Sequence, residues 1–147
     1  MYFKKIWKNL GKSTPLYGAD VKGSLFRDDS KYPWDLTKLD TVLTDGLNNL
    51  KMAGITTPYL YIGGIGTLFG WHVEDLNLPS INYNHFGKPK FWYSIGREDY
   101  KKFETFVKIY FPEEFLVCSQ YLRHKTILIN PYFIKHYLPE ISLKKTI

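Results

Sequence analysis

His72 and Glu74 are the residues whose types and spacing most directly suggest chemistry. They are two residues apart in a segment with strand character, so their side chains should leave the same face of the backbone and could reach one metal ion. A ferrous ion held by two histidines and one carboxylate keeps its other positions open for a cosubstrate and dioxygen. The pair therefore predicts part of an iron site, although a His-x-Glu pair by itself is more typical of an ordinary charged pair at a strand edge.

Longer motifs around the pair favour the iron site. They are Gly54-Ile55-Thr56-Thr57-Pro58-Tyr59-Leu60-Tyr61, Phe69-Gly70-Trp71-His72, Ser80-Ile81-Asn82-Tyr83, His85-Phe86-Gly87-Lys88-Pro89-Lys90 and Leu122-Arg123-His124-Lys125. In these motifs the chain resembles the JmjC-domain histone lysine demethylases, which are Fe(II)- and 2-oxoglutarate-dependent dioxygenases. It is most similar to the JmjN/JmjC subfamily that acts on trimethylated lysines of histone three, and the resemblance runs from about Trp7 to Tyr137.

The resemblance implies a mainly β fold with flanking helices, which is the double-stranded β-helix (jelly roll, cupin-like) of JmjC domains. Residues 1–147 would form a partial JmjC domain, the N-terminal part of the catalytic core. The family's third iron ligand is a histidine that we expect past Ile147, and none of the other histidines occupies its position. We therefore expect a C-terminally truncated domain whose last strands are missing and whose activity alone is an open question.

Hydrophobic periodicity predicts where the helices and strands lie. Leucines and a valine at helical spacing predict a helix over 35–52 that Asp35 caps. A second helix should open at Glu98 and end near Pro112, followed by short helices over 112–122 and after Pro131, and residues 138–140 should lead out of the fold. Short aromatic or β-branched runs predict strands at 59–62, 67–71, 80–83, 90–94 and 126–130.

A binding site for 2-oxoglutarate needs positively charged or hydroxyl donors for the carboxylate that is far from the metal. The resemblance assigns these roles to Lys90 and Tyr17, with Asn82 as a further polar contact and Phe69 and Trp92 as apolar walls. Plain core packing is the more common role for such aromatic residues. Lys90 is harder to explain in that way, because a lysine buried among aromatic residues is costly without an anionic partner.

The methyl-lysine substrate should bind in an aromatic pocket, since a quaternary ammonium is attracted to ring faces. The resemblance assigns this pocket to Tyr59, Tyr61 and the backbone around Gly54. It places Asp20 and Lys125 near the path of the histone peptide.

Cys118 and His124 match half of a structural zinc site in the same subfamily. A structural zinc ion needs four ligands, so these two residues would hold zinc only if residues absent from this sequence completed the site. A buried thiol and a surface histidine are the simpler description of the pair.

Composition is consistent with one intracellular domain. The chain has 147 residues, one cysteine and a net charge of +6, and it has no apolar stretch long enough to span a membrane. The expected partners are a histone tail with a methylated lysine and the nucleosome, in the nucleus, with no sequence-specific nucleic-acid motif. The alternative is a non-catalytic JmjC remnant that acts as a binding module, or a truncated gene product.

Overall fold

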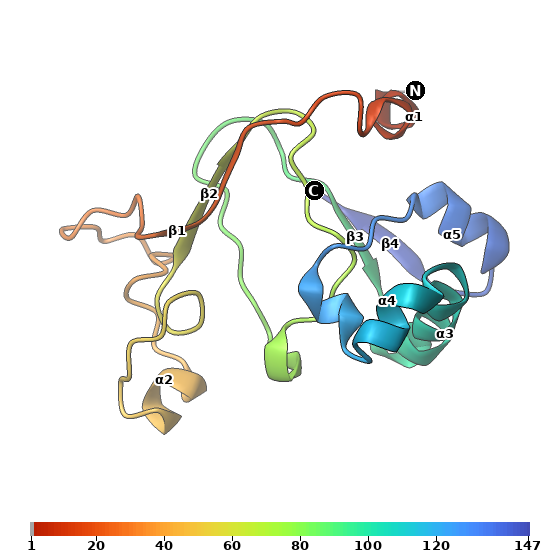
Figure 1. The fold of residues 1–147 in the computed structure, drawn as a ribbon. Helices are drawn as coiled ribbons and strands as arrows, with labels where there is room; N and C mark the ends of the chain where they lie inside the picture. The colour runs from red at the N-terminus through yellow and green to blue at the C-terminus, as the bar shows by residue number, and fades with distance from the viewer. Residues whose placement is uncertain (1) are drawn as a thin grey trace. The chain divides into compact units, whose positions relative to one another are not determined.

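The structure is a computed structural model that describes residues 2–147, with side chains from residue 6 onward. It divides into two compact units, here called the N-terminal unit (up to Thr67) and the C-terminal unit (Leu68–Ile147). Each unit carries one antiparallel two-stranded sheet and short helices (Figure 1). The two units are described separately below.

The N-terminal unit is built around a two-stranded sheet. Strand β1 (Tyr17–Lys22) pairs antiparallel with β2 (Tyr59–Gly63), and the pairing shifts between Gly18 and Val21. Asp20 lies at this irregularity with a left-handed backbone (φ 55°), which Asp tolerates better than most residues. The unit also contains helices α1 (Tyr2–Asn9) and α2 (Val42–Gly46).

The helix predicted over residues 35–52 is wrong, because only the five residues of α2 are helical. Asp35 does not cap a helix; its Oδ1 accepts hydrogen bonds from the backbone N–H and the hydroxyl of Thr37, at 2.9 and 2.6 Å. Thr41 caps α2 by accepting from the Thr44 N–H, and Asn48 and Asn49 turn left-handed just after it. Short polar side chains thus bind the local backbone and override the leucine periodicity.

The C-terminal unit places helices against a second sheet. Its core contains Phe103, Val107, Leu122, Ile127 and Ile134, all buried. Figure 1 shows α3, α4 and α5 grouped near this sheet. Its elements are η1 (Asp75–Asn77), β3 (Trp92–Ile95), η2 (Arg97–Asp99), α3 (Tyr100–Tyr110), α4 (Pro112–Val117), η3 (Tyr121–His124), α5 (Pro131–Tyr137) and β4 (Leu143–Thr146).

The predicted helices of this unit are confirmed as α3, α4 and α5, although the helix predicted over 112–122 is split into α4 and η3. The predicted strands at 59–62 and 90–94 correspond to β2 and β3. Those at 67–71, 80–83 and 126–130 are not strands. The prediction that residues 138–140 leave the fold is also wrong, because β4 follows and pairs antiparallel with β3.

The structure shows small two-stranded sheets with flanking helices, and it does not confirm the expected double-stranded β-helix. Among the described residues the sheet orders are β1-β2 and β3-β4. The segments 70–71 and 125–127 approach as strands would, but two backbone hydrogen bonds join them instead of a continuing ladder.

Asp99 joins the start of α3 to the residue before β4. Its buried carboxylate accepts from the Ser142 N–H at 2.9 Å and lies 3.3 Å from the Lys102 ammonium. The Ser142 hydrogen bond lowers the pKa of Asp99, burial opposes this shift, and Lys102 adds to the lowering. The ionised carboxylate therefore stabilises the folded state.

We predict that Asp99→Asn reduces the pH dependence of stability. Because the pKa of Asp99 is lowered on folding, its contribution is present above the ordinary aspartate value near 3.9 and is lost as the pH falls through the folded value. Urea unfolding between about pH 6 and pH 3 should show a shallower decline for the variant. Asp40→Asn, at an exposed position, serves as the control, and equal slopes for the wild type and Asp99→Asn would contradict the prediction.

Candidate functional site

The segment that carries His72 is held against residues 125–129 by main-chain hydrogen bonds. The Gly70 N–H donates to the Lys125 carbonyl at 3.1 Å and the Trp71 N–H to the Ile127 carbonyl at 2.7 Å. The Trp71 indole N–H donates to the Ile129 carbonyl at 2.9 Å, and the indole packs on a core phenylalanine. The residues immediately before His72 are therefore fixed to the core of the C-terminal unit.

His72 and Glu74 converge as their spacing predicted, although the segment is not a regular strand. The Nε2 atom of His72 lies 3.3 Å from Oε1 of Glu74, and its Nδ1 lies 2.8 Å from the Gly70 carbonyl oxygen. Because a carbonyl only accepts, Nδ1 carries a proton and donates to it. In this tautomer the lone pair of Nε2 faces the Glu74 carboxylate, an arrangement that suits a cation bound by both atoms.

The geometry fits two ligands of one metal ion. Nitrogen and oxygen ligands that lie about 2.1 Å from a metal and at right angles to each other are about 3 Å apart, close to the 3.3 Å observed. A ring nitrogen that donates to a backbone carbonyl is also the usual way in which a metal-binding histidine is oriented. Among residues 2–147 no group of three or more His, Cys, Asp or Glu side chains is placed to hold a metal ion.

Glu74 also forms an ion pair with Lys125. The Lys125 ammonium lies 3.3 Å from Oε2, the oxygen that does not face His72. Burial alone would raise the pKa of Glu74, but Lys125 and then His72 outweigh it and hold the pKa below the ordinary value. The carboxylate is thus kept ionised, as a metal ligand must be.

The Phe69 ring has both His72 and Lys90 as neighbours. Its ring centroid is 6.3 Å from that of His72 and 4.8 Å from the Lys90 ammonium, which is also 5.4 Å from the centroid of the Trp92 ring. Burial lowers the pKa of Lys90. One aromatic ring is therefore near both the imidazole and the ammonium.

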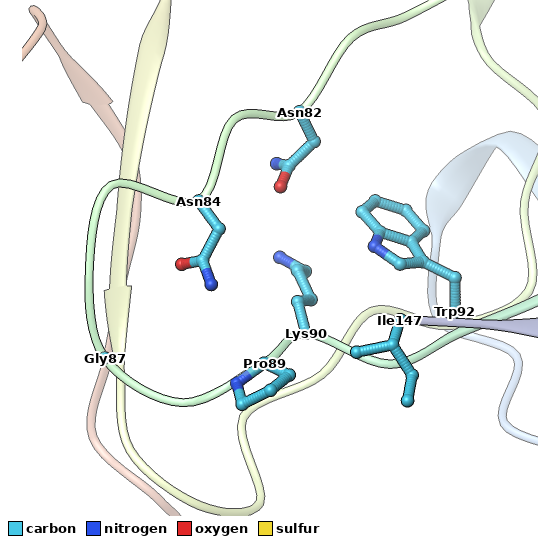
Figure 2. A pocket seen from close by; sticks show the side chains of 7 residues that line it. All are labelled: Asn82, Asn84, Gly87, Pro89, Lys90, Trp92 and Ile147. Carbon is cyan, nitrogen blue, oxygen red and sulfur yellow. The ribbon is translucent and has the colours of Figure 1, made fainter.

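A cavity of about 370 Å³ adjoins Lys90. Figure 2 shows its ammonium directed into the space between Asn82, Asn84 and Trp92. The cavity combines a cation, two amides and an indole face, a combination suited to a small anionic ligand with an apolar portion. Its lining residues are Asn82, Asn84, Gly87, Pro89, Lys90, Trp92 and Ile147.

The predicted substrate residues of the N-terminal unit lie around its sheet. The Tyr61 hydroxyl donates to Oδ1 of Asp20 at 2.6 Å, and the Tyr61 and Tyr17 rings are 6.3 Å apart. Burial and the Asp20 carboxylate raise the pKa of Tyr17. Gly54 has φ +76°, and a Cβ there would lie 2.4 Å from the Tyr59 ring. A carboxylate and two aromatic rings thus gather on one side, and the backbone of Gly54 contacts a third ring.

Cys118 and His124 lie at the ends of two short elements of the C-terminal unit. Cys118 follows α4 as a half-buried free thiol, and His124 is the last residue of η3. Neither belongs to a group of three potential metal ligands among the described residues.

The family model for the JmjC domain, described as a hydroxylase, matches residues 59–144. The chain belongs to the JmjC domain family. The matched range contains the His72–Glu74 pair and the cavity residues from Asn82 to Trp92, whereas Tyr17, Asp20 and Gly54 lie before it.

Curated relatives of this JmjC chain cover nearly its whole length. It is 44% identical over 136 residues to lysine-specific demethylase 4B of Mus musculus, over 91% of this chain and 12% of the relative. It is 43% identical over 134 residues to lysine-specific demethylase 4D of Rattus norvegicus, over 90% of this chain and 26% of the relative. It is 42% identical over 135 residues to probable lysine-specific demethylase 4F of Homo sapiens, over 90% of this chain and 21% of the relative. The chain thus spans at most about a quarter of the length of these relatives.

Sequence reasoning missed several residues of this JmjC site. Arg123 donates to the Glu74 carbonyl, and Asn77 accepts from the same guanidinium. Asn84 and Ile147 line the cavity beside Lys90. Arg123 stands in the motif that contains Lys125, so the signal was present there, but its partner could not be read from the sequence.

No helix of the described chain has the length and hydropathy that crossing a membrane requires.

Proposed function

We propose that this chain carries part of the catalytic core of an Fe(II)- and 2-oxoglutarate-dependent dioxygenase of the histone lysine demethylase type. The convergence of His72 Nε2 and Glu74 Oε1 at 3.3 Å, with the imidazole oriented by the Gly70 carbonyl, is the observation that carries the proposal. Family membership and the names of the relatives support it. We propose residues 1–147 as a partial domain of the double-stranded β-helix fold.

His72 and Glu74 would hold the ferrous ion, with further ligands from outside this pair. Lys90 would bind the distal carboxylate of 2-oxoglutarate in the adjoining cavity, assisted by Asn82, while Phe69 and Trp92 exclude water from its carbon chain. Tyr17 is proposed as a second donor to that carboxylate. Iron, dioxygen and the keto acid together would supply the oxidation that hydroxylates an N-methyl carbon, after which formaldehyde leaves.

The substrate proposed for the site is a methylated lysine of histone three. Tyr59 and Tyr61 offer ring faces to the methylammonium, and the Gly54 backbone lies against the Tyr59 ring. Asp20, held by the Tyr61 hydroxyl, and Lys125 are proposed to lie along the peptide.

The proposed setting is chromatin. The partner would be the histone tail within a nucleosome, and the proposed location is the nucleus. Cys118 and His124 would bind zinc only together with two further ligands.

A non-catalytic binding module is the second candidate. Among the described residues, the carboxylate of Glu74 is already satisfied by Lys125 on one oxygen and faces His72 with the other. Such a network can also hold a protein surface together without a metal ion. A binding module would keep the cavity and the aromatic residues but release no formaldehyde.

Metal titration tests the proposal. We expect the chain to bind Mn(II), an oxygen-stable substitute for Fe(II), and His72→Ala to weaken binding at least about tenfold because one of two protein ligands is lost. The amount of unbound Mn(II), measured by electron paramagnetic resonance, gives the affinity. His136→Ala, an exposed histidine on α5, is the matched control.

Equal Mn(II) binding by wild type and His72→Ala would rule out the proposed ligand role. Formaldehyde release from a trimethyl-lysine peptide with Fe(II) and 2-oxoglutarate separates the two candidates. Release that disappears in His72→Ala supports the dioxygenase, whereas peptide binding without release supports the binding module.

A further inference from the structure

The turn directly after Glu74 has an unfavourable backbone. Leu76 and Asn77 are consecutive non-glycine residues with left-handed angles, φ 54° and 55°. A left-handed leucine is uncommon because its Cβ crowds the carbonyl oxygen, whereas asparagine tolerates this region better. The Leu76 side chain is 85% exposed, so its burial does not offset the strain. Contacts from elsewhere must hold this turn in place.

Arg123 provides these contacts from 46 or more residues away in the sequence. Its Nη1 donates to the main-chain carbonyl of Glu74, and its Nη2 donates to Oδ1 of Asn77 at 3.0 Å. Its Nε donates to Oε1 of Gln120 at 3.0 Å, which fixes the guanidinium from its own side. A planar guanidinium can donate to the two acceptors of the turn and to Gln120 at the same time. A lysine ammonium does not reproduce this geometry.

The hydrogen bonds of the turn itself start from the same carbonyl. The Asn77 N–H donates to the Glu74 carbonyl at 3.0 Å, and the Leu78 N–H donates to the Asp75 carbonyl at 3.1 Å. Arg123 therefore binds the carbonyl that begins the turn and the side chain at its far end. Releasing the guanidinium would let the left-handed residues relax and would change the direction in which Glu74 leaves the backbone.

We propose that Arg123 is a positioning residue that aims the Glu74 carboxylate by clamping the turn over residues 74–77. Its consequence for metal binding rests on the proposed function, whereas its effect on the turn does not. Lys125 contacts the carboxylate itself, so the two basic residues of this segment have separate tasks. Arg123 holds the main chain, and Lys125 balances the charge.

Two measurements on the full chain test the clamp. Hydrogen exchange of the Asn77 and Leu78 amides reports on the turn, and Mn(II) affinity reports on the aim of Glu74. We expect Arg123→Gln to speed exchange of both amides at least tenfold and to weaken Mn(II) binding several-fold, while amides of α3 keep their protection. Arg97→Gln, at an exposed position on η2, should change neither.

A second substitution distinguishes positioning from general loss of structure. Glycine adopts left-handed angles without strain, so Leu76→Gly added to Arg123→Gln should restore much of the amide protection and of the Mn(II) affinity. Arg123→Lys keeps the charge but not the planar guanidinium, and it should resemble Arg123→Gln. A variant that only unfolds the chain would not be rescued by Leu76→Gly.

The outcomes separate this proposal from the proposed function. Unchanged exchange of the turn amides in Arg123→Gln, or absence of rescue by Leu76→Gly, would overturn the clamp. Full recovery in Arg123→Lys would also overturn it, because charge alone would then suffice. If the wild type binds no Mn(II), the proposed metal role of Glu74 fails, and amide exchange still decides whether Arg123 holds the turn.

Discussion

Replacing Gly70 by alanine should lower the free energy of unfolding of the C-terminal unit by about 3 kcal/mol. A Cβ at this position would lie 2.4 Å from the Lys125 carbonyl oxygen and 2.7 Å from that of Ile127. Both are backbone atoms and cannot rotate away, so the two segments must separate. Separation weakens the main-chain bonds of Gly70 and Trp71 as well as the indole bond to Ile129.

Urea unfolding followed by circular dichroism measures this loss, and hydrogen exchange of the Trp71 amide locates it. Gly64→Ala is the matched control, because a Cβ there meets no atom within 4 Å and its φ lies outside the left-handed region. Gly70→Ala should also bind Mn(II) less tightly, since His72 follows the displaced segment. An alanine at position 70 that costs no more than the one at position 64 would show that the two segments are not held as closely as described.

Lys90→Met should weaken 2-oxoglutarate binding about 100-fold, equivalent to about 2.7 kcal/mol. The ammonium points into the cavity, and a charge-assisted hydrogen bond to a carboxylate contributes about 1.5–3 kcal/mol. The stability of the free chain should change little. Methionine removes a charge that burial disfavours, but it also removes the contacts with the Phe69 and Trp92 rings.

Calorimetry with 2-oxoglutarate in the presence of Mn(II) measures the affinity. Lys88→Met is the matched control, because Lys88 is exposed and lies two residues away. A loss of binding together with an unchanged unfolding midpoint would separate anchoring from folding. If both methionine variants bind equally well, Lys90 does not anchor the cosubstrate.

The parts of the fold that sequence could predict are those in which local signals agree. Helix α3 has a regular apolar face and buries Phe103, Phe106 and Val107, so its prediction is confirmed. The prediction of a helix over 35–52 failed because Asp35 and Thr41 bind nearby backbone groups, an effect that leucine spacing does not reveal. The segment 126–130 failed in another way. Ile127 and Ile129 are buried as in a strand. Their carbonyls, however, accept from the backbone and indole N–H groups of Trp71 and not from the backbone N–H groups of a paired strand.

The candidate site shows the same division between local and distant information. The approach of His72 to Glu74 followed from a spacing of two residues, and the structure places their polar atoms side by side. The contribution of Arg123 could not be predicted, because it depends on how η3 packs beside a turn far away in the sequence. The roles assigned to Tyr17, Lys90 and the other site residues remain predictions until binding is measured.

The wall of the cavity beside Lys90 includes the end of a strand. Trp92 pairs with Thr146 at the end of β4, and Ile147, the next residue, lines the cavity. Binding in the cavity and pairing of β4 with β3 should therefore be coupled, so that each favours the other to the same extent. A bound molecule would slow unzipping of the strand, and substitutions that loosen this pairing would shorten the residence time of the molecule without touching any group that binds it.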